Sequence, residues 1–135
     1  MEELMKLAEE AYNNSYSPYS GIRIGAAAKG GSGRIYTGTN IENSSYGATI
    51  CAERSAIAKA VSDGEKEITA LAVTGDIDGY AYPCGICRQV MSEFMGLDAK
   101  VGISGKGKAM IVYKLSELLP SAFEYNRGGN KNNGV

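Results

Sequence analysis

Three cysteines are the side chains of this chain with the clearest chemical potential. Two form the C-x-x-C pair Cys84-Gly85-Ile86-Cys87, directly after Pro83, and the third is Cys51. The pair alone is compatible with a structural zinc knuckle, a dithiol redox pair or a zinc site with three thiolates. A knuckle requires a fourth protein ligand, and a redox pair requires no third cysteine. The pattern therefore favours three thiolates with one open coordination position, the arrangement of catalytic zinc sites.

Two residues beside Cys51 could act on a substrate or on the metal: Glu53 and Arg54. The chain contains no histidine, so a carboxylate is the natural candidate for a general base and acid. Zinc with three thiolates carries a net negative charge, which opposes ionisation of a bound water, and an arginine that hydrogen-bonds to thiolate sulfur offsets it. Each residue taken singly has an ordinary interpretation. Glu53 would be a solvated carboxylate, Arg54 a member of a surface ion pair, and the cysteines inert buried thiols. The combination of the three cysteines with Glu53 and Arg54 is what indicates a catalytic site.

The elements that must position these side chains alternate between helices and strands. Apolar residues at helical spacing predict a first helix over residues 4–12. Alternation with a period of two predicts a hairpin from residues 22–29 and 34–39, around a glycine-rich turn. The remaining predicted elements are a helix over 51–62, a buried strand over 68–74, a helix between Pro83 and Gly96, strands over 101–104 and 110–113, and a short helix over 115–119. This order predicts a sheet covered by helices, an α/β layered sandwich.

Two of the predicted helices begin at candidate ligands, near Cys51 and Cys84. The Cβ bonds of a helix tilt toward its N-terminus, so side chains of the first turn can reach a site that lies off that end. The positive end of the helix dipole favours thiolate there. We therefore expect the two helix starts to face one common point.

The composition describes one ordinary domain and excludes several function classes. The 135 residues include 14 basic and 15 acidic side chains, a net charge of −1, which leaves no broad basic stripe for a nucleic-acid backbone. No apolar run reaches the about eighteen residues that span a bilayer, and the acidic start lacks the order of a secretory signal. An odd number of cysteines fits a reducing compartment. We predict a cytoplasmic protein with one domain over residues 1–123 and a flexible polar tail over residues 124–135.

Longer motifs around the cysteines resemble a known family. Cys51-Ala52-Glu53 followed by Pro83-Cys84-Gly85-Ile86-Cys87 is similar to the zinc-deaminase signature, with cysteine where many members have histidine. The chain further resembles the small tetrameric cytidine deaminases in Asn40-Ile41-Glu42-Asn43, Cys51-Ala52-Glu53-Arg54 and Pro83-Cys84-Gly85-Ile86-Cys87-Arg88-Gln89. The resemblance extends from about residue 16 to residue 123. It implies a three-layer α/β/α sandwich with a five-stranded mixed sheet, one zinc per subunit, and a homotetramer with sites near the subunit interfaces.

The resemblance also implies a reaction and a role for each motif residue. Cys51, Cys84 and Cys87 are the implied zinc ligands, and Arg54 supports the thiolates. Zinc-bound hydroxide attacks C4 of cytidine or deoxycytidine, and Glu53 protonates N3 and then the departing amino group. The products are uridine or deoxyuridine and ammonia, as in pyrimidine salvage. The backbone N–H of Ala52 binds the base carbonyl.

Asn40 and Glu42 are implied to hold the ribose. If residues 40–42 are extended, these two side chains point to one face and Ile41 points to the core. A carboxylate beside the sugar repels phosphate, which predicts the free nucleoside as substrate. The family also implies that Tyr46 lines the site or a subunit contact and that Phe123 reaches the base in a neighbouring subunit. Ile22 departs from the family pattern, because phenylalanine is common there and isoleucine offers no ring face.

Three other functions remain open at this point. The chain could deaminate an aminopyrimidine nucleoside antibiotic such as blasticidin, although Asn40 and Glu42 favour a plain ribose. It could deaminate tRNA or single-stranded DNA, which the slightly acidic charge disfavours. It could also be a zinc-stapled binding module without chemistry, which would be expected to close its metal site with a fourth protein ligand.

Overall fold

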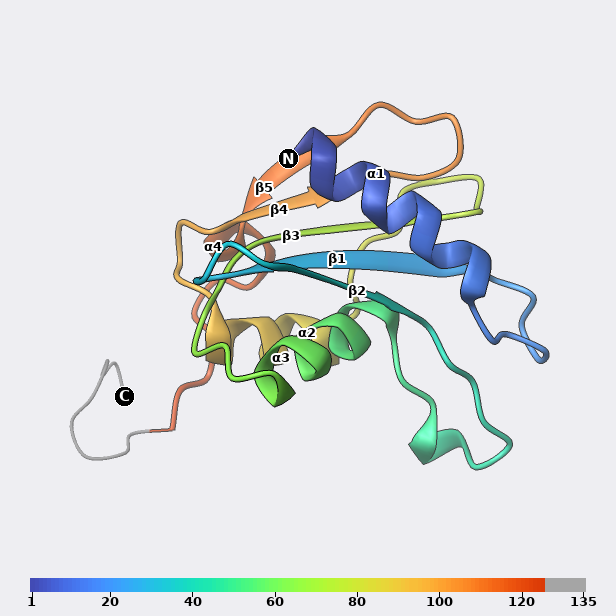
Figure 1. The fold of residues 1–135 in the computed structure, drawn as a ribbon, viewed down its shortest axis with the longest axis horizontal. Helices are drawn as coiled ribbons and strands as arrows, with labels where there is room; N and C mark the ends of the chain where they lie inside the picture. The colour runs from blue at the N-terminus through green and yellow to red at the C-terminus, as the bar shows by residue number, and fades with distance from the viewer. Residues whose placement is uncertain (126–135) are drawn as a thin grey trace.

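A five-stranded sheet divides the molecule into three layers in the computed structural model, which describes residues 1–125 (Figure 1). The strands are β1 (Ile24–Gly30), β2 (Ile35–Thr39), β3 (Ile68–Gly75), β4 (Lys100–Ile103) and β5 (Ile111–Lys114), in the order β2-β1-β3-β4-β5. β3 and β4 are parallel, and the other neighbouring pairs are antiparallel. The predicted α/β/α sandwich with a five-stranded mixed sheet is confirmed.

One helix covers the first face of the sheet. α1 (Glu2–Ala11) is followed by the 3-10 turn η1 (Tyr12–Asn14), where the predicted helix ends. Its apolar stripe packs on small strand residues, and the buried set is Leu4, Met5, Ala8, Ala27 and Ala72. Alanines on β1 and β3 leave the room that α1 needs to lie close to the sheet.

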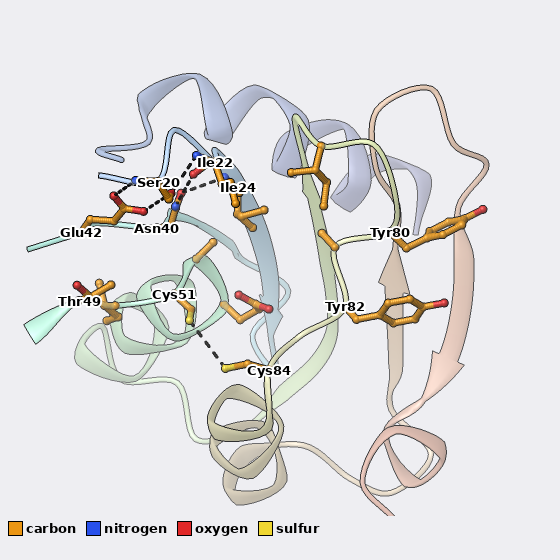
Figure 2. A pocket seen from close by; sticks show the side chains of 15 residues that line it. Ser20, Ile22, Ile24, Asn40, Glu42, Thr49, Cys51, Tyr80, Tyr82 and Cys84 are labelled. Carbon is orange, nitrogen blue, oxygen red and sulfur yellow. Dashed lines mark hydrogen bonds between the residues drawn. The ribbon is translucent and has the colours of Figure 1, made fainter. Parts of the chain in front are cut away.

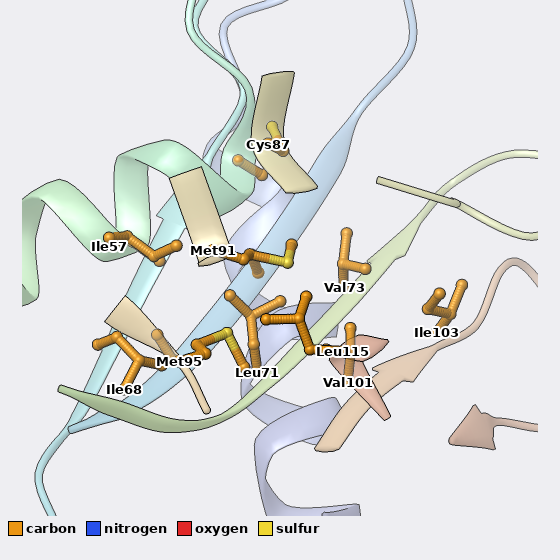
Figure 3. Close-up of a cluster of buried hydrophobic side chains, with 14 of the residues drawn as sticks. Ile57, Ile68, Leu71, Val73, Cys87, Met91, Met95, Val101, Ile103 and Leu115 are labelled. Carbon is orange, nitrogen blue, oxygen red and sulfur yellow. The ribbon is translucent and has the colours of Figure 1, made fainter. Parts of the chain in front are cut away.

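Three helices lie on the other side: α2 (Ala52–Ser62), α3 (Gly85–Phe94) and α4 (Leu115–Leu118). They bury the larger core, which Figure 3 shows between the helices and the central strands; its largest side chains include Ile57, Ile68, Leu71, Met91, Val101, Ile103 and Leu115. β3 is buried on both faces, with Ala72 toward α1 and Leu71 and Val73 toward the larger core. The sequence predicted this central strand correctly.

Gly38 fixes how closely α2 lies on β2. A Cβ atom at Gly38 would stand 2.4 Å from the backbone nitrogen of Ala56 and 2.7 Å from the carbonyl oxygen of Ala52. Only glycine allows this approach without moving the helix. The start of α2, which carries Cys51 and Glu53, is therefore held against the sheet by a backbone contact.

Two local expectations were wrong at the loops beside the sheet. β1 begins at Ile24 rather than Ile22, because the backbone N–H of Ile22 donates to the Ser20 hydroxyl and its carbonyl accepts from the Asn40 amide instead of joining a strand. Ile41 does not point to the core: it is 44% exposed. It lies in a loop outside the sheet, where Ile41 itself forms isolated bridges to Tyr16 and Ile50.

Within the residues that the structure describes, no helix combines the length and apolarity needed to cross a bilayer. The tail predicted over residues 124–135 lies outside the described residues from residue 126 onward.

Candidate active site

The three cysteines converge at the starts of α2 and α3. Cys51 is the residue that precedes α2, Cys84 precedes α3, and Cys87 lies in the first turn of α3. The Sγ atoms of Cys51 and Cys84 are 3.9 Å apart, and all three sulfurs lie within 4.8 Å of one another. All three are free thiols. The prediction that two helix starts face one point is confirmed.

These sulfur positions fit a tetrahedral zinc ion. Zinc–sulfur bonds of about 2.3 Å at tetrahedral angles place sulfur atoms about 3.8 Å apart, close to the separation of Cys51 and Cys84. Three thiolates leave a fourth coordination position, and Cys51 and Cys84 both line a cavity. The donor set therefore fits a zinc site that is open on the cavity side.

Arg54 lies against the sulfur cluster, as the charge argument predicted. Its Nη2 donates to the Sγ of Cys51 at 3.4 Å. Hydrogen bonds from Cys87 and then from Arg54 stabilise the Cys51 thiolate against the effect of burial and lower the pKa of Cys51 to about 5. The guanidinium thus favours the anionic, ligating form of the thiol.

Glu53 is a buried carboxyl group that lines the same cavity. Its side chain is 4% exposed, and burial raises the pKa of Glu53 to about 7. A carboxyl group with a pKa near neutrality can both accept and return a proton at neutral pH. The buried Glu53 therefore differs from a solvated helix carboxylate, which would be the ordinary interpretation of a glutamate at this position.

The cavity has a volume of about 420 Å³, within the usual size of small-molecule sites. Figure 2 shows the labelled side chains around it, with Ser20, Asn40 and Glu42 on one side and Cys51 and Cys84 on the other. Its lining residues are Ser20, Ile22, Ile24, Asn40, Glu42, Thr49, Ile50, Cys51, Ala52, Glu53, Ile77, Tyr80, Ala81, Tyr82 and Cys84.

Asn40 and Glu42 line the cavity together, and both already hold the segment before β1. The Asn40 Oδ1 accepts from the Ser15 hydroxyl at 2.5 Å and from the Ile24 N–H at 2.9 Å, while its Nδ2 donates to the Ile22 carbonyl at 2.8 Å. This leaves Asn40 one free N–H donor. Asn40 can therefore only donate to a ligand.

Glu42 keeps its acceptor role. Its Oε1 accepts from the backbone N–H groups of Tyr19 and Ser20, and its Oε2 accepts from the Ser20 hydroxyl. The Ser20 hydroxyl is the main cause that lowers the pKa of Glu42. An ionised Glu42 beside an N–H of Asn40 suits a hydroxyl that donates to one and accepts from the other.

The two aromatic candidates lie outside this cavity. Tyr46 is 87% exposed, on the 3-10 turn η2 (Tyr46–Ala48), and borders a neighbouring depression that also includes Glu42. Phe123 is 69% exposed, and its carbonyl accepts from the Gln89 side chain at 3.2 Å. The structure of one chain therefore brings neither ring to the cavity, whereas Ile22 and Ala52 both line it.

Sequence reasoning missed most of the cavity wall. Ile77, Tyr80 and Tyr82 come from the segment between β3 and α3, and the tyrosine hydroxyls bond away from the cavity, to the Ala109 carbonyl and to Tyr113. Ser20 was also missed, although a serine in a Pro-Tyr-Ser-Gly turn is a residue type that bonds to neighbouring backbone.

A sandwich of this topology, with three thiols at two helix starts beside a buried glutamate, defines a zinc-dependent deaminase. Within that class, the chain belongs to the cytidine and deoxycytidylate deaminase family: the family model for its zinc-binding region matches residues 1–103. Zinc is accordingly the cofactor.

Individual relatives agree with this assignment along most of the chain. It is 44% identical over 120 residues to a cytidine deaminase of Halalkalibacterium halodurans, covering 89% of this chain and 91% of that protein. It is 50% identical over 126 residues to a probable cytidine deaminase of Dictyostelium discoideum, covering 90% and 84%. The crystal structure of a cytidine deaminase from Burkholderia pseudomallei superposes with a TM-score of 0.86 at 37% identity, covering 90% and 98%.

Proposed function

We propose that this chain hydrolyses cytidine and 2′-deoxycytidine to uridine and 2′-deoxyuridine with release of ammonia. The observation that carries the proposal is a cluster of three thiols beside one cavity, which Cys51, Cys84, the buried Glu53, Asn40 and Glu42 line. Cys51, Cys84 and Cys87 are the proposed zinc ligands. When bound, zinc supplies the Lewis acidity that makes a water nucleophilic near neutral pH.

Glu53 is the proposed proton carrier. It takes a proton from the attacking water and gives it to N3 of the base. It then takes the proton of the new hydroxyl at C4 and delivers it to the departing amino group, so that cytidine and water become uridine and ammonia. Its buried carboxyl group, with a pKa of about 7, suits both directions of transfer. Arg54 keeps Cys51 in its thiolate form.

The remaining lining residues are proposed to bind the nucleoside. The N–H of Ala52, in the first turn of α2, has no partner within the helix, and we assign it to the base carbonyl. Asn40 donates to a sugar hydroxyl and Glu42 accepts from it. The negative charge of Glu42 disfavours a phosphorylated sugar, which supports a free nucleoside rather than a nucleotide or polynucleotide.

We further propose a homotetramer in the cytoplasm that serves pyrimidine salvage. The strongly exposed rings of Tyr46 and Phe123 are available for a second copy of the chain, and Phe123 is proposed to complete a neighbouring site. Sedimentation of the active protein tests this: we expect a tetramer, and a fully active monomer would contradict it.

The experiment that tests the function follows the loss of cytosine absorbance when zinc-loaded protein is mixed with cytidine, together with metal analysis. Glu53→Gln should keep zinc and lose about 10²-fold to 10⁴-fold in turnover. Near-normal turnover in that variant removes Glu53 from the mechanism. Faster turnover of blasticidin than of cytidine would favour the antibiotic as substrate, and no absorbance change with any nucleoside would favour a binding module.

A further inference from the structure

The segment that closes the sugar side of the cavity, residues 15–24, is held by polar contacts more than by a core. Tyr19 is 59% exposed and Ile22 is 47% exposed. Two side chains outside the segment hold it instead. Asn40 bonds to Ser15, Ile22 and Ile24. Glu42 bonds to Tyr19 and Ser20. Its position therefore depends on the two side chains proposed to bind the sugar.

Ser20 is the residue of this segment whose hydroxyl bonds to Glu42. Its hydroxyl donates to the Oε2 of Glu42 at 2.5 Å and accepts from the backbone N–H of Ile22 at 3.0 Å, and its own N–H donates to the Oε1 of Glu42 at 3.1 Å. Both Ser20 and Ile22 line the cavity. One hydroxyl thus joins the Glu42 carboxylate to the backbone of the segment before β1.

The described partners of Glu42 are all neutral: the N–H groups of Tyr19 and Ser20 and the hydroxyl of Ser20. An ionised carboxylate has about four acceptor positions, and three of them are filled. The remaining position is the one a ligand hydroxyl can use. Because no cation neutralises Glu42 in these contacts, its charge stays at the cavity.

We propose that Ser20 is a positioning residue that sets affinity for the sugar, by locking the Glu42 carboxylate so that its last acceptor position faces a ribose hydroxyl. The inference rests on the proposed function. Ser20 acts through Glu42 and lies on the loop side of the cavity, whereas Cys84 lies on the α3 side (Figure 2). It therefore affects binding of the nucleoside rather than the chemical step.

Ser20→Ala is the decisive variant, with Ser20→Thr as the conservative one. Ser17→Ala is the matched control, because the Ser17 hydroxyl lies in the same segment but contacts the Ser15 hydroxyl and lines no part of the cavity. We expect Ser20→Ala to raise KM for cytidine about 10-fold, as for loss of a hydrogen bond to a charged group, with kcat changed less than about two-fold. Ser20→Thr and Ser17→Ala should stay close to wild type.

A substrate series separates positioning from a general structural role. The variants are assayed with 2′-, 3′- and 5′-deoxycytidine, and Glu42→Gln identifies the hydroxyl that Glu42 binds. The KM penalty of Ser20→Ala should vanish for the analogue that lacks that hydroxyl. Three results for Ser20→Ala would overturn the proposal: an equal KM penalty on every analogue, a loss in kcat alone, or loss of zinc and of the thermal transition. Absence of deamination in the wild type would instead overturn the proposed function.

Discussion

Gly38→Ala tests whether the contact of α2 with β2 positions the active site. The added Cβ would lie 2.4 Å from the Ala56 nitrogen and 2.7 Å from the Ala52 oxygen, whereas ordinary contacts begin near 3.4 Å. Both obstacles are backbone atoms, so no side chain can rotate away. The helix must therefore move by about 1 Å at its N-terminal half, or β2 must move instead.

That displacement reaches the residues that we assign to chemistry, since Ala52 lies between Cys51 and Glu53. Overpacking of this kind costs about 1–3 kcal/mol of stability. A shift of about 1 Å in a positioned catalytic group costs about 10²-fold in rate. We expect Gly38→Ala to lose more in kcat than its stability loss alone would explain at temperatures where it remains folded.

Three assays separate the effects of the substitution. Urea unfolding measures stability, zinc transfer to a colorimetric chelator measures zinc retention, and cytidine turnover measures the rate. Gly96→Ala is the control, because a Cβ there meets no atom within 4 Å, and it should leave all three near wild type. If Gly38→Ala keeps wild-type stability, zinc retention and rate, the close approach of α2 to β2 does not position the site and the reasoning fails.

Two further perturbations follow from the hydrogen bonds. Arg54→Gln removes the guanidinium that donates to the Cys51 sulfur, so zinc should transfer to a chelator about 10–100-fold faster; an unchanged transfer rate would mean that Arg54 does not support the thiolate. The Tyr36 hydroxyl donates to Asp63 and Glu65, and chiefly the bond to Asp63 raises the pKa of Tyr36 from 10.0 to about 12. The wild type should thus keep this stabilisation below pH 10 and lose it between pH 10 and about 12. Tyr36→Phe should have a lower urea midpoint at pH 7 but no such alkaline loss, and equal pH dependence of both proteins would contradict this.

The residues that we propose as metal ligands and proton carrier could be proposed from the sequence because local patterns mark them. A C-x-x-C pair after a proline, a third cysteine followed by alanine and glutamate, and the absence of histidine restrict the possible metal ligands and bases to very few residues. Helical spacing of apolar residues likewise identified α1 and α3, and a nearly continuous apolar run identified the buried strand β3, since both signals depend on neighbours within a few positions.

Only the tertiary structure determines the distances between the cysteines and between the segments that line the cavity. Cys51 and Cys84 approach to 3.9 Å across 33 positions of the chain because α2 and α3 pack side by side on the same face of the sheet. The bonds of Ser20, Asn40 and Glu42 likewise join segments about twenty positions apart. No local pattern showed that the Asn40 acceptor would be filled or that Ile41 would be exposed. Such features depend on which surfaces meet in three dimensions, and short-range sequence signals carry no information about that.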